Sequence, residues 1–108
     1  MSLQDWHRSG WLVAQAAISG DIANFLDLAD RDIHAARVKD LDEDWRFNIA
    51  YNGAFQTAIA ALAAAGYRVA RGSSKHHYAI QSLALTIGAD LETVQLLDQF
   101  RRKRNIAE

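Results

Sequence analysis

The sequence contains no cysteine, no proline and no long apolar run, and it carries almost no net charge. The absence of cysteine excludes disulfides, thiolate catalysis and zinc sites built on cysteine, and the absence of proline suits long uninterrupted helices. No apolar run approaches the roughly 18 residues of a membrane span, and the start lacks the layout of a signal peptide. We therefore expect a cytoplasmic protein without a membrane partner. Because the net charge is −1, any nucleic acid would have to be bound by a local basic patch.

The composition is that of one globular domain. Half of the 108 residues are hydrophobic and 23% are charged, which is enough apolar material for a core without metal or disulfide support. The common catalytic signatures are missing: a glycine-rich phosphate loop, the His-Glu-x-x-His motif, a nucleophile elbow and a recognisable pair of carboxylates. We therefore expect neither a cofactor nor a metal.

Apolar residues recur at helical spacing along most of the chain, and no segment is predicted to form a strand. The pattern predicts five helices, over residues 3–18, 21–36, 42–65, 75–87 and 91–105. Asp21 and Asp90 are placed as N-caps, Ser73 or Ser74 as the cap of the fourth helix, and Gly66 as a left-handed C-terminal cap. Short connections favour antiparallel neighbours, so we predict an all-α, up-and-down bundle.

The predicted core follows one stripe on each of the last three helices. Its members are Trp45, Phe55, Ile59 and Leu62, then Ile80, Leu83, Ala84 and Ile87, then Val94, Leu97 and Phe100. A buried tryptophan at position 45 would make Trp45→Ala cost about 3–5 kcal/mol of stability.

Polar side chains interrupt these stripes at three places. Asn48 and Asn52 align with Phe55, His76 aligns with Ile80, and Arg104 lies at the centre of the stripe of the last helix. Buried polar groups need hydrogen-bond partners, so these side chains either meet one another or face a shared cleft. Simpler interpretations remain open: the asparagines as an interhelical bond, the histidine as part of a helix start, and the basic run 101–104 as a favourable helix C-terminus.

From residue 21 onward the layout resembles HEPN domains, which are helical bundles of bacterial toxin–antitoxin and RNA-targeting systems. The resemblance rests on the long helix through 45–55 to Gly66, the helix opened by 76–80, and the closing pair Arg104-Asn105. It covers about four-fifths of the chain. It implies a HEPN-like four-helix bundle over 21–108 within a single domain, with 1–20 as an N-terminal helical extension.

The resemblance also implies a function: active members are metal-independent ribonucleases. Their motif is an arginine, usually followed by a polar residue such as asparagine, and then a histidine four to six residues after the arginine. Arg104 and Asn105 match its first half, whereas the histidine would fall at 108–110 and position 108 is Glu108. We therefore expect weak or absent cleavage by these residues, with His76 as a replacement base from another helix.

The combined interpretation is an RNA- or nucleotide-binding domain of toxin-like or stress-response type that forms a homodimer. Arg104, Asn105 and His76 are the catalytic candidates. Phosphate contacts are predicted for Arg101, Arg104, Arg68 and Lys75, with Asn48 and Asn52 as polar support. A competing interpretation is a non-catalytic module that dimerises or binds an antitoxin or other protein, and a third is small-ligand binding between helices.

Overall fold

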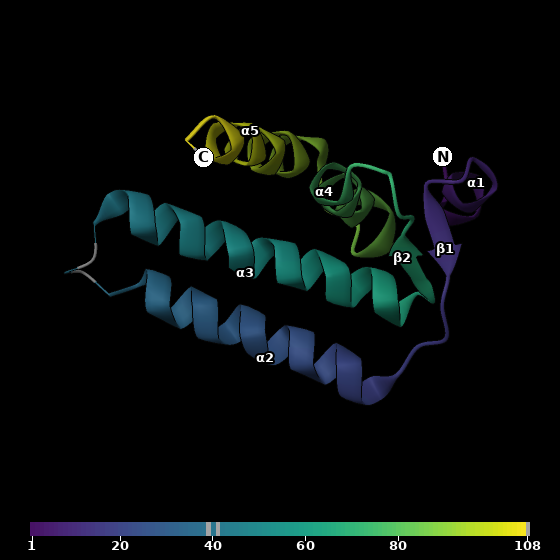
Figure 1. The fold of residues 1–108 in the computed structure, drawn as a ribbon, viewed down its shortest axis with the longest axis horizontal. Helices are drawn as coiled ribbons and strands as arrows, with labels where there is room; N and C mark the ends of the chain where they lie inside the picture. Colours follow the sequence, from purple (N-terminus) through teal and green to yellow (C-terminus); the bar gives the residue numbers. More distant parts are fainter. Residues whose placement is uncertain (39, 41, 108) are drawn as a thin grey trace.

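Helix α3 is the centre of the architecture. The computed structural model describes residues 1–38, 40 and 42–107, with the side chains of these residues up to Arg104. Over this part of the chain the elements are α1 (Leu3–Arg8), β1 (Leu12–Ala14), α2 (Ser19–Ala36), α3 (Glu43–Ala64), β2 (Tyr67–Val69), α4 (Lys75–Thr86) and α5 (Leu91–Ala107). Helix α2 runs along one side of α3, while α4 and α5 contact α3 from the other side and lie across it (Figure 1). The protein is therefore mostly helical, as predicted.

Two short strands were not expected from the sequence. The predicted helix over 3–18 ends at Arg8, because Gly10 takes φ = +84° and turns the chain. The following strand β1 pairs antiparallel with β2, and Leu12 lies opposite Val69. The prediction of no strand was wrong because each strand has only three residues, too few for an alternating pattern to be recognised.

Two of the predicted caps are confirmed, at the end of α3 and at the start of α5. Asp42, predicted as the first residue of the third helix, is instead the N-cap of α3, and its carboxylate accepts a hydrogen bond of 2.8 Å from the backbone N–H of Asp44. Gly66 has φ = +92° immediately after α3, as expected of a left-handed cap. Asp90 accepts a bond of 2.7 Å from the N–H of Thr93 at the start of α5.

Two other predicted caps differ. Helix α2 begins at Ser19 with Ile18 at the N-cap position, so Asp21 lies in its first turn. There the carboxylate still faces the positive end of the helix dipole. Ser74 does occupy the N-cap position of α4, but its side chain makes no capping hydrogen bond.

The contact between α2 and α3 depends on small residues. Ala29 is buried, and Gly53 lies against it from α3. A Cβ atom at Gly53 would lie 3.3 Å from the Ala29 carbonyl oxygen and 3.2 Å from Cγ1 of Ile33. Glycine at this position therefore lets the two backbones approach closely.

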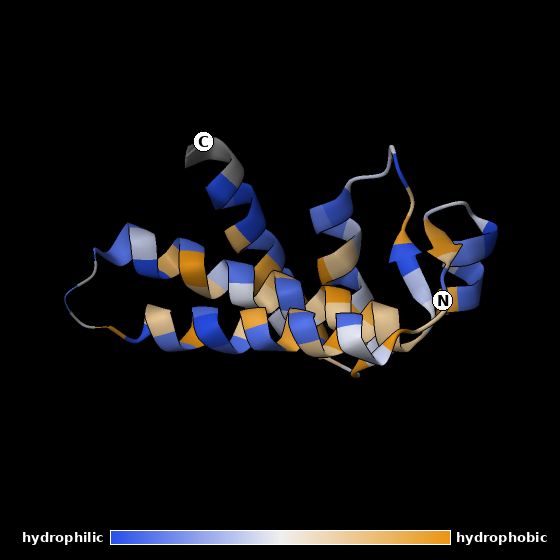
Figure 2. Cartoon of the chain, turned by 60° about the horizontal axis from the view of Figure 1, so that its bottom comes forward, coloured by the Kyte–Doolittle hydropathy of each residue, from blue (hydrophilic) through white to orange (hydrophobic). Residues whose placement is uncertain are grey.

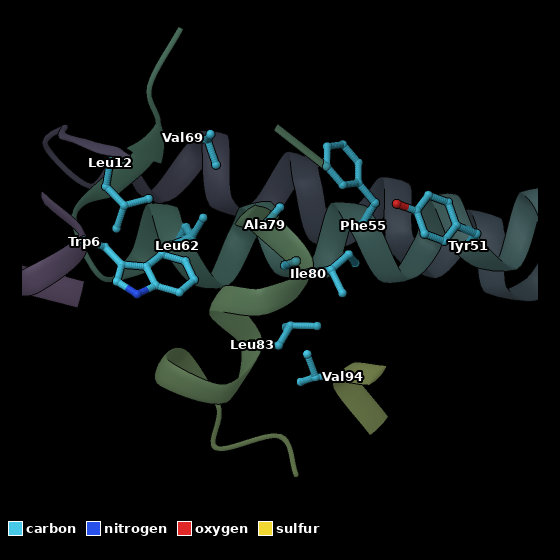
Figure 3. Close-up of a cluster of buried hydrophobic side chains, with 11 residues drawn as sticks. Trp6, Leu12, Tyr51, Phe55, Leu62, Val69, Ala79, Ile80, Leu83 and Val94 are labelled. Carbon is cyan, nitrogen blue, oxygen red and sulfur yellow. The ribbon is translucent and has the colours of Figure 1, made fainter. Parts of the chain in front are cut away.

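The core lies where α1, the two strands, α4 and α5 meet α3 (Figure 3). Its buried members are Trp6, Leu12, Tyr51, Phe55, Ala58, Leu62, Val69, Ala79, Ile80, Leu83 and Val94. Phe55, Leu62, Ile80, Leu83 and Val94 confirm the predicted stripes, while Ile59, Leu97 and Phe100 are partly buried against this core. The core faces of α3, α4 and α5 thus meet.

Three predicted core residues are exposed. The side chain of Trp45 is 65% exposed, in the first turn of α3, where α2 and α3 extend furthest from α4 (Figure 1). Ile87 is 62% exposed at the C-cap of α4, and Ala84 is exposed as well. The buried face of α3 passes through Tyr51, Phe55, Ala58 and Leu62. This face is offset from the predicted stripe, which passed through Ile59.

Candidate functional site

A buried tyrosine joins two residues that were singled out separately in the sequence. Tyr51 of α3 is only 1% exposed, and its hydroxyl lies 3.0 Å from Nδ1 of His76 in the first turn of α4. The imidazole stacks on the ring of Phe55, with centroids 4.0 Å apart and planes tilted by 8°. His76 is therefore held in a defined orientation by α3.

Arg104 of α5 contacts the same tyrosine. Its guanidinium carbon lies 5.3 Å from the centroid of the Tyr51 ring, within the range of a cation–π interaction. We call Tyr51, Phe55, His76 and Arg104 the Tyr51 cluster. Two of the three catalytic candidates thus lie in one cluster, although they come from different helices.

The environment keeps the Tyr51 phenol protonated near neutral pH. Burial raises the pKa of Tyr51 above its usual value, while the positive charges of Arg104 and Arg101 oppose this shift only in part. A neutral phenol can donate a hydrogen bond to an unprotonated Nδ1 of His76, or accept one when that nitrogen carries a proton. The bond can therefore form with either tautomer of the imidazole.

Sequence reasoning missed Tyr51, although a signal was present. Tyr51 precedes Phe55 by four residues and Leu62 by eleven, which is the spacing of one helix face. Asn48 and Asn52 are both half-buried on α3, so each is partly accessible at the flanks of the tyrosine.

A second cluster neutralises part of the basic run. Asp98 is buried on α5, and its carboxylate lies 2.9 Å from Nε of Arg101 and 2.9 Å from Nη2 of Arg102. Nδ1 of His77 lies 3.5 Å from the same carboxylate. Burial raises the pKa of Asp98, but the hydrogen bond from Arg101 and the surrounding positive charges outweigh it, so the pKa lies below its usual value.

The four cations of the run 101–104 are therefore not equivalent. The side chain of Arg101, a predicted phosphate ligand, is 15% exposed and bonded to Asp98, whereas Arg102 is 68% exposed while making its ion pair. Lys103 lies over the ring of Phe47, with Nζ 4.9 Å from the centroid. Arg104 lies over the ring of Tyr51 and belongs to the Tyr51 cluster. The side chain of Asn105 is outside the described residues.

Arg68 and Lys75, the other predicted phosphate ligands, lie around a pocket beside β2 and the start of α4. Nζ of Lys75 is 5.9 Å from the centroid of Phe55, so this pocket borders the Tyr51 cluster. Arg68 instead lies on β2, in a part of the pocket lined by the strand and its loop. The predicted phosphate ligands therefore belong to two neighbouring places. Arg68 and Lys75 line the pocket, whereas Arg101 and Arg104 lie on α5.

Three further observations concern ligands and relatives. Within the described residues, no group of three His, Asp or Glu side chains is arranged to hold a metal ion. No helix in that same part of the chain is long and apolar enough to span a membrane. Comparisons with models of protein families, with characterised proteins and with solved structures find no match to this chain.

Proposed function

We propose that this chain is a HEPN-like four-helix-bundle domain that binds RNA through the phosphate backbone at the Tyr51 cluster. The observation that supports this most is the meeting of Arg104 and His76 on Tyr51. A guanidinium can bind phosphate through two hydrogen bonds, and an imidazole can exchange protons near neutral pH. In the scheme that the HEPN resemblance implies, the arginine holds the scissile phosphate and the histidine moves the proton of the RNA 2′-OH.

Binding is proposed as the main activity and cleavage as weak or absent. In the family motif the histidine follows the arginine by four to six residues, whereas His76 comes from α4 and is bonded through Nδ1 to a neutral phenol. If RNA is cleaved, both His76→Ala and Arg104→Ala should abolish it, and cleavage that persists in Arg104→Ala would contradict this site.

The RNA-binding prediction has a matched pair of variants. Arg104→Ala should weaken binding of a single-stranded RNA by about tenfold or more, because a charged hydrogen bond to phosphate is lost. Arg102→Ala removes the same charge from the same helix but should cost less than about threefold, because Arg102 is exposed beside Asp98 and does not belong to the Tyr51 cluster. Fluorescence anisotropy at several salt concentrations measures both, and binding should weaken steeply with salt.

The outcomes of this comparison separate the function classes. Equal losses in the two variants would indicate a nonspecific basic helix end rather than a site. Absence of RNA binding would favour the second candidate, a non-catalytic module that binds an antitoxin or another protein. That candidate is favoured by exposed apolar side chains on α2 and at the start of α3, namely Leu26, Ile33 and Trp45.

We also propose that the domain forms a homodimer. Leu91 and Leu96 of α5 are 70% and 48% exposed, and they lie on the helix that carries Arg104. A two-fold contact through α5 would bury part of this exposed apolar surface and bring two Tyr51 clusters toward one cleft. Sedimentation equilibrium at tens of micromolar (roughly the range of a weak dimer) should show a dimer, and a strict monomer would argue against it.

A further inference from the structure

The pocket beside β2 has an apolar floor and a positively charged rim. Its volume is about 630 Å³. Ile59 and Leu62 of α3 and Phe25 of α2 form apolar walls, while Arg68, Arg71 and Lys75 line it from β2, from the β2–α4 loop and from the first residue of α4. In Figure 2, blue on part of β2 and on part of the loop that follows marks hydrophilic residues, next to a short orange, hydrophobic stretch. The pocket can therefore contact a charged group and an apolar body together.

The three cations are not neutralised by nearby acids. None of the residues that line the pocket is an aspartate or a glutamate. Across the described residues, Arg68, Arg71 and Lys75 make no ion pair with a carboxylate. Like charges held around one pocket repel one another, and a bound anion relieves that repulsion. The charge distribution therefore selects an anion of more than one negative charge.

The start of α4 adds the positive end of a helix dipole to the same place. Gly72 takes φ = +84°, and the space around it is open, so no side chain covers the loop here. The helix that follows has no acidic residue in its first turn, and Ser74 makes no side-chain cap. Exposed N–H groups at the start of α4 can thus add to the attraction exerted by the three side chains.

We propose that this pocket binds a small organic phosphomonoester, such as a mononucleotide. The phosphate contacts Arg68, Arg71 and Lys75, and the apolar or aromatic body packs over Ile59 and Phe25. A phosphomonoester carries close to two negative charges at neutral pH, which suits a three-cation rim better than a single carboxylate. This inference is independent of RNA binding at the Tyr51 cluster.

The test uses adenosine monophosphate as the probe, measured by isothermal titration calorimetry at low salt. We expect saturable binding with a dissociation constant below about 1 mM. Adenosine should bind at least about tenfold more weakly, because it lacks the phosphate, and inorganic phosphate should also bind more weakly, because it lacks the apolar body. Amide chemical shifts of Gly72 and Ser73 should move on addition of the nucleotide.

Two variants locate the site. Arg71→Ala should weaken binding of the nucleotide by about fivefold or more. The matched control is Arg37→Ala, an exposed arginine at the C-cap of α2 that does not line the pocket, and it should have no effect.

Three results would overturn the proposal: no saturable binding up to about 5 mM, equal binding of adenosine, or equal affinity in Arg71→Ala and the wild-type chain. Loss of RNA binding alone would not affect it. Arg71 is exposed, so its replacement should leave the fold intact, as unfolding midpoints of the two arginine variants would verify.

Discussion

Replacing Leu62 with alanine should lower the free energy of unfolding by about 2–5 kcal/mol. The side chain is 1% exposed and belongs to the core that joins α3 to α1, the strands and α4 (Figure 3). Truncation removes buried apolar surface and leaves a cavity that the surrounding helices can fill only in part. Urea unfolding followed by circular dichroism measures the loss, and an unchanged slope with denaturant would show that only stability changed.

The control for this substitution is Trp45→Ala. Trp45 is the larger side chain, and its position on the sequence pattern predicts a greater loss than that of Leu62. Its side chain is 65% exposed, however, so we expect a change of less than about 1 kcal/mol. A loss of about 3 kcal/mol or more, the value of a buried aromatic, would contradict the exposed position. A loss that grew with protein concentration would instead reveal that Trp45 is buried in a dimer.

Replacing Asp98 with alanine should cost about 1.5–3 kcal/mol near pH 7. The substitution removes the carboxylate that binds Arg101 and Arg102 and leaves Arg101, only 15% exposed, without its ion-pair partner. Asp27→Ala, at an exposed position on α2, should change stability by less than about 0.5 kcal/mol. Equal effects of the two substitutions would show that the Asp98 ion pairs add no net stability.

The same carboxylate has a defined pH dependence. Because the pKa of Asp98 is lowered in the folded protein, its contribution to stability is present above the usual aspartate pKa of about 3.9. The contribution is lost as the pH falls through the folded pKa. The stability difference between the wild-type chain and Asp98→Ala should therefore be present at about pH 5 and shrink below about pH 4. A difference that did not shrink on further acidification would contradict the lowered pKa.

Local signals in the sequence determined the helices and several of their ends. Asp42, Asp90 and Gly66 act at α3 and α5 as their chemistry requires. These features depend on residues within one or two turns of each other, so a pattern of a few residues contains the needed information. The helical character of the protein and the inward direction of Phe55 and Leu62 follow from the same kind of local periodicity.

The sequence did not determine which end of an apolar helix stripe is covered by other helices. Trp45 and Phe55 look equivalent in a helical pattern, but only Phe55 lies where α4 packs against α3. The sequence did not predict the strands for the same reason. Leu12 forms a strand only by pairing with Val69, which lies far along the chain. Burial of one helix end and pairing of short strands both depend on contacts between distant segments, which local patterns do not contain.

The candidate site could be predicted from the sequence only in part. His76 and Arg104 could be selected from the sequence because a polar residue on an apolar stripe requires a partner. Their common contact, Tyr51, emerged only when α4 and α5 were placed on the same side of α3. The sequence thus determined which polar side chains lie on apolar stripes. Tertiary packing decided which of them meet, because the distances between helices are set by the contacts of their whole surfaces.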